Sequence, residues 1–230
     1  MSSTHGNTIE NDNYETPVEC VDALMKLVDF RPNDEFLEPC KGENENIYSR
    51  VNLPEAQKQW AEITQGVDYL NTSFTKKDVI ITNPPFSLSE PFIEKMLSEL
   101  KEDGTLIFLQ RVNFLGSVKR VPFWAKVGFP EKAPILVPRP RFVGGGSDSC
   151  EYCWFIYDRG NRTSKIPNSF SHIVAEQKPR KPKKPRKSKK KIQIDLNNLA
   201  VPSIVDACTE AKTEGKSYDD MTLEELMSNF

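Results

Sequence analysis

The sequence contains few of the residues on which metal sites and disulfide frameworks depend. It has two histidines and five scattered cysteines among 230 residues. An odd number of scattered cysteines implies no disulfide framework. Cys150 and Cys153 form a Cys-x-x-Cys pair, but a zinc site would need a second pair or suitably spaced histidines, which His5 and His172 do not supply. We therefore expect no metal site.

Long hydrophobic runs are also missing. No apolar run approaches the roughly 18–20 residues that a membrane-spanning helix needs. The N-terminus lacks the basic and then apolar stretch of a secretion signal. Hydrophobic residues make up 37% of the chain and charged residues 28%, values typical of a soluble protein. We expect no membrane partner and a cytoplasmic location.

The net charge of −2 conceals a strong segregation of charge along the chain. Residues 178–191 carry ten basic side chains and no acidic one, whereas the segments on either side are acidic. This pattern predicts a folded domain over 1–177, a disordered basic linker over 178–191, and a partly helical acidic segment over 192–230 that could bind a protein partner. The linker is typical of polyanion binding, with a nuclear localisation signal as the alternative. Its expected nucleic-acid contacts are Lys183, Lys184, Arg186 and Lys187.

Short apolar runs alternate with a helical stretch in the first two thirds of the chain. The apolar spacing of 90–101 predicts a helix. The β-branched and apolar runs predict strands, and several are apolar throughout, which indicates strands covered on both faces. We therefore expect a three-layer α/β/α domain. The predicted strands are 35–38, 59–63, 78–82, 104–109, 133–137 and 151–157.

A polar and aromatic tetrad follows the strand predicted at 78–82. It consists of Asn83, Pro84, Pro85 and Phe86. The Asn83 amide oxygen and the Pro84 carbonyl could each accept one N–H of an exocyclic amino group, which would make that nitrogen more nucleophilic. The two prolines would hold these acceptors in place, and Phe86 would offer a flat face to a flipped-out base. The alternative is an ordinary strand-ending turn.

A glycine turn follows the first predicted strand and could lie against a bound cofactor. Gly42 would allow close backbone approach, and Glu38 could contact an ammonium group. Asn44 stands where a second glycine is usual, and asparagine tolerates positive φ better than most residues. Further along, Glu62 could grip a ribose and Asp68 an adenine amino group, with Tyr69 packed on the ring. The alternative for each acid is a solvated surface carboxylate.

Five segments of the sequence, taken in order, resemble the amino-methyltransferases of DNA, in particular small phage-type N6-adenine enzymes. The resemblance covers roughly residues 13–158 and implies a Rossmann-like methyltransferase fold. It further implies transfer of a methyl group from S-adenosylmethionine to N6 of adenine in DNA, in a bacterial host cytoplasm if the enzyme is phage-encoded. The segments are 13–17, 37–42, 60–63, 66–69 and 83–86.

The resemblance also assigns roles to residues. The tetrad would hold the target base, and Asn44 departs from the family's glycine motif. Two alternatives stay open: an enzyme acting on RNA or on protein glutamine, and a non-catalytic DNA-binding decoy. Cys40 is interpreted as a packing residue. The implied contacts to S-adenosylmethionine are Tyr14, Thr16, Glu38, Gly42, Glu62 and Asp68.

Basic and aromatic residues are interleaved after the strand predicted at 104–109, a combination suited to phosphate contacts and base stacking. Arg139 and Arg141, which precede a run of three glycines, are the predicted DNA contacts in this region. Phe123 and Trp124 could instead form the apolar face of an amphipathic helix.

Overall fold

The computed structural model describes residues 14–142, 150–168 and 171–174 of the chain. The predicted basic linker and acidic segment lie outside the described residues, as do Lys183, Lys184, Arg186 and Lys187. The domain boundaries predicted there therefore stay predictions.

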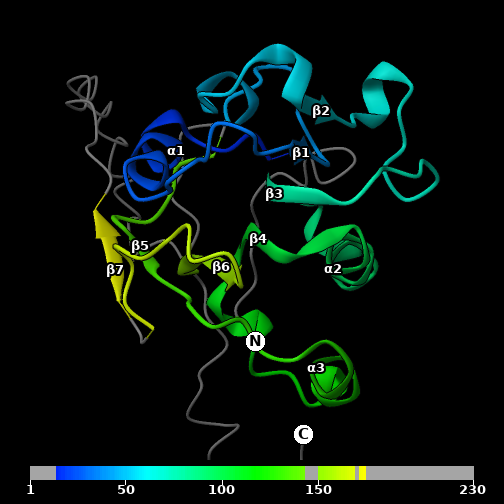
Figure 1. Ribbon diagram of the computed structural model, residues 1–230. Helices are drawn as coiled ribbons and strands as arrows, with labels where there is room; N and C mark the ends of the chain where they lie inside the picture. Colours follow the sequence, from blue (N-terminus) through cyan, green and yellow to red (C-terminus); the bar gives the residue numbers. More distant parts are fainter. Residues whose placement is uncertain (1–13, 143–149, 169–170, 175–230) are drawn as a thin grey trace, which may run out of the picture. The chain divides into compact units, whose positions relative to one another are not determined.

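A seven-stranded sheet in the order β2-β1-β3-β4-β6-β5-β7 forms the centre of the described domain (Figure 1). Its strands are β1 (Phe36–Glu38), β2 (Lys58–Trp60), β3 (Lys77–Thr82), β4 (Leu100–Arg111), β5 (Ile135–Val137), β6 (Tyr152–Asp158) and β7 (His172–Val174). The helices are α1 (Val18–Met25), α2 (Ser89–Ser98) and α3 (Val121–Val127). Short 3-10 turns are η2 (Tyr48–Arg50), η3 (Glu55–Gln57), η4 (Ile63–Gln65), η5 (Phe86–Leu88), η6 (Val112–Phe114) and η7 (Val118–Arg120).

The sheet is parallel on one side and mixed on the other. β2, β1, β3 and β4 run parallel, so that β1, β2 and β3 all end at the same edge. β6 pairs antiparallel with β4 along its whole length, from Thr105 opposite Asp158 to Arg111 opposite Tyr152. β5 then pairs antiparallel with β6 and parallel with β7.

Both faces of the sheet are covered by helices. Alternate residues of β3 point to opposite faces: Val79 and Ile81 join α1 in one apolar cluster, and Ile80 joins α2 and α3 in the other. Figure 1 shows α1 on one side of the sheet and α2 with α3 on the other. The predicted three-layer α/β/α arrangement is confirmed. None of the helices in the described part has the length and apolar character needed to cross a bilayer.

Most predicted elements are present, with shifted ends. The helix predicted at 90–101 spans Ser89–Ser98, and the strand predicted at 59–63 ends earlier, at Trp60. The sequence did not reveal α1 or β7. Phe123 and Trp124 are buried on α3, so the amphipathic-helix alternative is correct for both.

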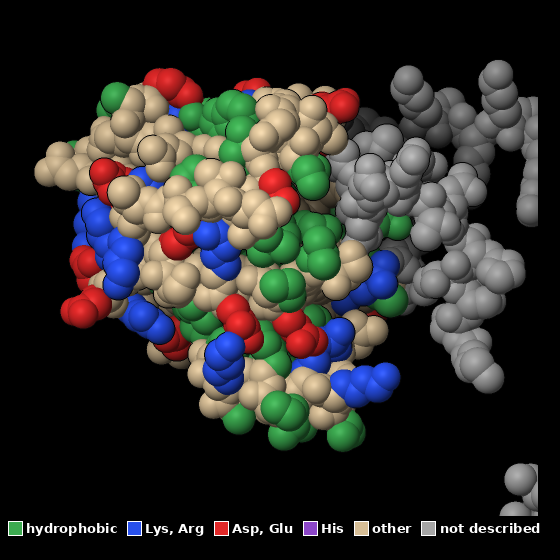
Figure 2. Space-filling view, turned by 90° about the vertical axis from the view of Figure 1, so that its right-hand side faces the viewer, with side chains coloured by type: hydrophobic (Ala, Val, Ile, Leu, Met, Phe, Trp, Pro, Cys, Tyr) green, Lys and Arg blue, Asp and Glu red, His purple; other side chains and the backbone are tan. Residues whose placement is uncertain are grey.

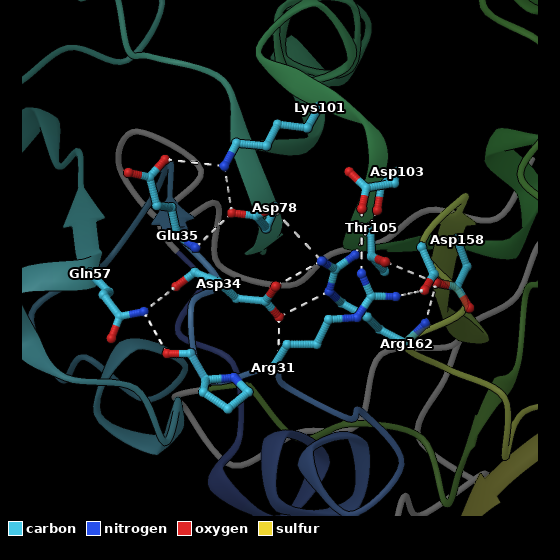
Figure 3. Close-up of polar contacts among 12 residues, drawn as sticks. Arg31, Asp34, Glu35, Gln57, Asp78, Lys101, Asp103, Thr105, Asp158 and Arg162 are labelled. Carbon is cyan, nitrogen blue, oxygen red and sulfur yellow. Dashed lines mark hydrogen bonds and ion pairs between the residues drawn. The ribbon is translucent and has the colours of Figure 1, made fainter.

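The edge of the sheet where β1, β3 and β4 begin carries a buried ion-pair network (Figure 3). Arg162 donates from Nε and Nη2 to the two carboxylate oxygens of Asp34 at 2.9 and 2.7 Å, with both side chains at most 3% exposed. Asp158 accepts hydrogen bonds from Thr105 and Thr163 and pairs with Lys132. Burial opposes ionisation of Asp158, but these hydrogen bonds outweigh it and hold its pKa at about 2.

Candidate functional site

A cavity of about 720 Å³ opens at the edge where β1, β2 and β3 end. The carboxyl ends of parallel strands are the usual place for ligands in open α/β sheets, and the volume lies within the range of small-molecule sites. The residues that the resemblance assigned to the cofactor all line it: Tyr14, Thr16, Glu38, Gly42, Glu62 and Asp68. Asn83 and Pro85 of the tetrad line it as well, whereas Pro84 and Phe86 do not.

The glycine turn after β1 is fixed by hydrogen bonds to the carboxylate of Glu62. Gly42 has a φ of +69°, in the left-handed region that favours glycine. Its N–H donates to Glu62 Oε2 at 2.8 Å, while Glu62 Oε1 accepts from the N–H and hydroxyl of Thr64 at 3.1 and 2.8 Å. Glu62 therefore joins the loop after β1 to the loop after β2, and it is a buried structural carboxylate rather than a solvated one.

Asn44 does not have a positive φ, so the turn does not use the tolerance of asparagine for that conformation. The described non-glycine residues with positive φ are Glu45, at 52°, and Asn161. The turn therefore closes one residue later than the glycine motif suggested, and the Glu45 carboxylate pairs with Lys41 Nζ at 2.8 Å. The ammonium group of Lys41 also lies 3.9 Å from the centre of the Trp60 ring.

Glu15 contacts the same turn, and sequence reasoning missed it. Its Oε1 accepts from the backbone N–H of Glu43 at 2.8 Å and of Asn44 at 3.2 Å. The only sequence signal was its position between Tyr14 and Thr16, two residues already assigned to the site.

Glu38 ends β1 with a buried carboxyl group that is not fully paired. The residue is 1% exposed, and its Oε2 has no hydrogen-bond partner among the described residues. Burial raises the pKa of this carboxyl well above its ordinary value. Asp68, by contrast, already accepts from the backbone N–H of Leu70 at 3.0 Å and the side chain of Asn71 at 2.6 Å.

Asn83 stands directly after β3 with its amide oriented by the N-terminal segment. Its Nδ2 donates to the carbonyl oxygen of Tyr14 at 2.6 Å. Its Oδ1 is buried and has no partner within the part of the chain that the structure describes. The amide therefore presents a spare acceptor, as the interpretation of the tetrad requires.

Aromatic rings surround Phe86. The Tyr14 ring lies nearly parallel to it, with centroids 5.9 Å apart and an angle of 18° between the planes. Tyr152 lies at 5.8 Å on a tilted plane, and the Arg111 guanidinium carbon is 5.2 Å from the Phe86 centroid. Tyr14, Phe86 and Tyr152 thus form an aromatic cluster, and Tyr14 also contacts Asn83 through its carbonyl oxygen.

Tyr69 does not take the role expected of it. The residue is 2% exposed, packs 5.2 Å from the Phe92 ring, and donates its hydroxyl to Glu99 Oε2 at 2.8 Å. A ring buried in this way cannot cover a ligand, so the hypothesis that Tyr69 packs on adenine is wrong. Cys40 packs against the cluster of α2 and α3, as expected, and also lines the cavity.

The basic side chains of the described surface are largely paired. Arg120 pairs with Glu90 and Lys126 with Glu94, at 3.0 and 2.8 Å. Figure 2 shows acidic and basic side chains side by side on the face that carries α2 and α3. Arg139 pairs with Glu151, and neither Arg139 nor Arg141 lines the cavity. The described ranges contain no group of three or more His, Cys, Asp or Glu side chains placed to hold a metal ion.

Comparison with known proteins finds similarity of structure only. No family model matches the sequence, and no curated protein matches it. The fold is similar to that of a proposed class I S-adenosylmethionine-dependent methyltransferase from Listeria monocytogenes, with a TM-score of 0.51 and 17% identity, over 74% of this chain and 68% of that one. The described domain thus has a Rossmann-like methyltransferase fold.

Two type I restriction-modification proteins are more distant. For a modification subunit from Vibrio vulnificus YJ016, the TM-score is 0.49 with 14% identity, over 64% of this chain and 45% of that one. For a methyltransferase subunit from Streptococcus thermophilus, the TM-score is 0.44 with 13% identity, over 64% and 46%. The chain thus spans less than half the length of either subunit.

Proposed function

We propose that this protein transfers a methyl group from S-adenosylmethionine to the exocyclic N6 of adenine in DNA. The observation that carries the proposal is the amide of Asn83. Its nitrogen is tied to Tyr14, while its buried oxygen is left as a spare acceptor beside the cavity. A buried acceptor without a partner is costly, so its retention at a strand end suits an amino group that arrives with the substrate.

The charges around the cavity suit the proposed cofactor. Three lining residues carry carboxylates, Glu15, Glu62 and Asp68, against the single ammonium group of Lys41. Glu38 adds a buried carboxyl group whose ionisation a cationic ligand would favour. S-adenosylmethionine has two positive groups, a sulfonium and an ammonium, and one carboxylate, so a cavity of this sign attracts it. The spare oxygen of Glu38 is a fitting acceptor for the ammonium group.

The remaining cofactor contacts follow the lining of the cavity. Gly42 lines the cavity without a side chain, so a ligand could come close to its backbone. Tyr14 and Thr16 would lie against the amino-acid half of the cofactor, and Glu62 and Asp68 would lie against its nucleoside half. When bound, S-adenosylmethionine supplies an electrophilic methyl group on its sulfonium sulfur.

Asn83 would act on the base. An exocyclic amino nitrogen is a poor nucleophile because its lone pair is delocalised into the ring. By accepting one N–H, Asn83 Oδ1 would favour a tetrahedral nitrogen, and the Pro84 carbonyl would accept the other. The interaction strengthens as positive charge develops on nitrogen, so it stabilises the transition state more than the ground state. Phe86, supported by Tyr14 and Tyr152, would provide the wall on which the flipped base stacks.

Methyl transfer from labelled cofactor tests the proposal directly. Duplex DNA, duplex DNA without adenine, RNA, and a protein extract would be supplied as separate substrates. We expect label in adenine-containing DNA and recovery of N6-methyl-2′-deoxyadenosine after digestion to nucleosides. Label in RNA or in protein would show that the substrate is RNA or protein instead of DNA. If cofactor binding is absent by calorimetry, the decoy alternative replaces the enzyme.

DNA affinity is proposed to come from Arg139, Arg141 and the basic linker, because Arg120 and Lys126 of the same region face the carboxylates of Glu90 and Glu94. A DNA phosphate would have to replace Glu151 as the partner of Arg139. Each lost phosphate contact should lower the slope of log affinity against log salt by roughly 0.9. Replacing Lys183, Lys184, Arg186 and Lys187 by serine should flatten that slope without altering base preference. An unchanged slope would remove the linker from the interface.

A further inference from the structure

The turn after β1 presents three successive backbone N–H groups, those of residues 42–44, and each already donates to a carboxylate of the protein. Gly42 donates to Glu62, and Glu43 and Asn44 donate to Glu15. Successive N–H groups in a turn form a concavity that binds anions. We define the N–H groups of Glu43 and Asn44 as the carboxylate seat.

We propose that Glu15 occupies the seat that the carboxylate of S-adenosylmethionine would take, and that it must leave before the amino-acid half of the cofactor binds fully. The inference rests on the proposed function and names a determinant of its affinity. Glu15 Oε1 is the atom held, at 2.8 Å from the Glu43 nitrogen and 3.2 Å from the Asn44 nitrogen.

The fit of the carboxylate against the turn is close. A Cβ placed on Gly42 would lie 2.7 and 2.9 Å from the two Glu15 oxygens, which is closer than side-chain atoms normally approach. The absence of a side chain at Gly42 therefore makes room for a carboxylate at this point. Glu15 also lines the cavity, so a ligand carboxylate could reach the same place from the open side.

The two charged ends of the amino-acid half would meet different conditions. The ammonium group meets Glu38 Oε2, which has no partner among the described residues. The carboxylate meets N–H groups that are already bonded. Glu15 is partly exposed, so it can turn into water, where a carboxylate is well solvated, and free the seat. Glu15 thus lowers the affinity for the carboxylate while its charge attracts the cation.

Calorimetric titration of two ligands separates these effects. S-adenosylmethionine and its decarboxylated analogue share the adenosine, the sulfonium and the amine, and differ in the carboxylate. In Glu15→Ala we expect S-adenosylmethionine to bind about tenfold more tightly, the effect of one hydrogen-bonded carboxylate. The decarboxylated analogue should bind Glu15→Ala as tightly as the wild type or more weakly. The variant lacks the attractive charge of Glu15, and the analogue has no carboxylate that could use the freed N–H groups.

Glu43→Ala is the matched control, because it removes an exposed negative charge from the same turn and leaves Glu15 on the backbone N–H groups. It should not change the ratio of the two affinities. Glu15→Gln removes the charge but keeps an acceptor, so it should move the ratio in the same direction by less. Melting curves would identify a variant that fails to fold, in which case Glu15→Gln decides.

The outcomes are distinct. If Glu15→Ala weakens both ligands equally, Glu15 only attracts cations and the inference is overturned, while the proposed function stands. An unchanged ratio has the same meaning. If the wild type fails to bind S-adenosylmethionine and Glu15→Ala binds it, the inference holds in its strongest form. If no variant binds either ligand, both the inference and the proposed function fail.

Discussion

The two edges of the sheet treat buried polar groups in opposite ways. At the edge where β1, β3 and β4 begin, Arg162 is bonded to both oxygens of Asp34, and Asp158 to Thr105 and Thr163. At the edge where β1 and β3 end, Glu38 Oε2 and Asn83 Oδ1 are buried without partners in the described part of the chain.

Under the proposed function, this difference separates groups that hold the fold from groups that a bound ligand would pair. Paired buried charges contribute to the native structure only as complete sets, and removing one member leaves the other uncompensated. Unpaired buried acceptors destabilise the native state and are useful only where a ligand supplies the donors. Substitutions at the first edge should therefore reduce stability, and substitutions at the second should reduce binding or turnover.

The largest expected effect is on stability, from Arg162→Leu. Asp34 would keep its charge at 3% side-chain exposure without its main partner, and breaking such a pair typically costs about 3–5 kcal/mol. The control is Lys165→Met, which removes an ion pair with Asp29 in which both side chains are about half exposed and should cost less than about 1 kcal/mol. Urea denaturation measures both. Equal decreases in the free energy of unfolding for the two variants would show that the buried ion pair contributes no more to stability than an exposed one.

The next effect concerns turnover. Asn83→Ala should slow single-turnover methylation by about 10²–10³-fold, by analogy with the loss of one preorganised hydrogen bond at an oxyanion hole. The free energy of unfolding should change by less than about 1 kcal/mol, because removal of the unpaired buried oxygen offsets the loss of the hydrogen bond to the Tyr14 carbonyl. The control is Asn113→Ala, at an exposed asparagine in η6. Wild-type rates in Asn83→Ala would reduce the tetrad to a turn.

A smaller effect is expected on the pH dependence of stability and of cofactor affinity, because of the ionisation of Glu38. Burial raises the pKa of this carboxyl in the folded protein, so the folded state holds a proton more tightly than the unfolded state. The protonated Glu38 carboxyl contributes to the free energy of unfolding at low pH. This contribution is lost as pH rises from the pKa of the unfolded chain to the raised pKa of the folded protein. An ammonium ligand prefers the ionised form, so affinity for S-adenosylmethionine should rise with pH, by at most about tenfold per unit.

Calorimetry in two buffers of different ionisation enthalpy would show the proton released on binding. Glu38→Gln should bind more weakly and lose the pH dependence, whereas Glu43→Gln, an exposed acid nearby, should keep it. Proton release that persists in Glu38→Gln would assign the titration to another group.

The smallest effect should come from Glu45→Gly. A non-glycine residue in the left-handed region costs on the order of 1 kcal/mol, and Glu45 has a φ of 52°. The loss of its ion pair with Lys41 should offset part of the gain. We expect the melting temperature to rise slightly in Glu45→Gly and not in Asn44→Gly, since the φ of Asn44 is not positive. A larger gain at Asn44 would contradict the geometry of the turn.

Local patterns were enough to predict six of the seven strands of the sheet and the residues after β1 that line the cavity. The β-branched run before Asn83 and the turn at Gly42 can each be recognised from a few neighbouring residues. Strand ends in a parallel sheet meet at one edge, which is why Glu38, Glu62 and Asn83, each at or just after the end of a strand, all line the cavity.

What could not be predicted depends on contacts between distant segments. Arg162 and Asp34 are 128 positions apart, and no local pattern indicates that they pair. Tyr69 was misassigned because its hydroxyl partner, Glu99, lies 30 positions away in the turn between α2 and β4. Glu15 has no motif of its own, and its role follows only from the N–H groups that the folded turn places in front of it.

The hydrogen bond from Asn83 Nδ2 to the Tyr14 carbonyl has a consequence for the fraction of molecules able to react. A side-chain amide can turn by 180° with little change in shape, which exchanges its acceptor for a donor. A turned Asn83 would face the amino group of the base with N–H groups, and that molecule would be folded but inactive. The Tyr14 carbonyl excludes this orientation, because two oxygens would then meet. Loosening the backbone at Tyr14 should therefore lower the number of sites counted by active-site titration while leaving the rate at each remaining site unchanged.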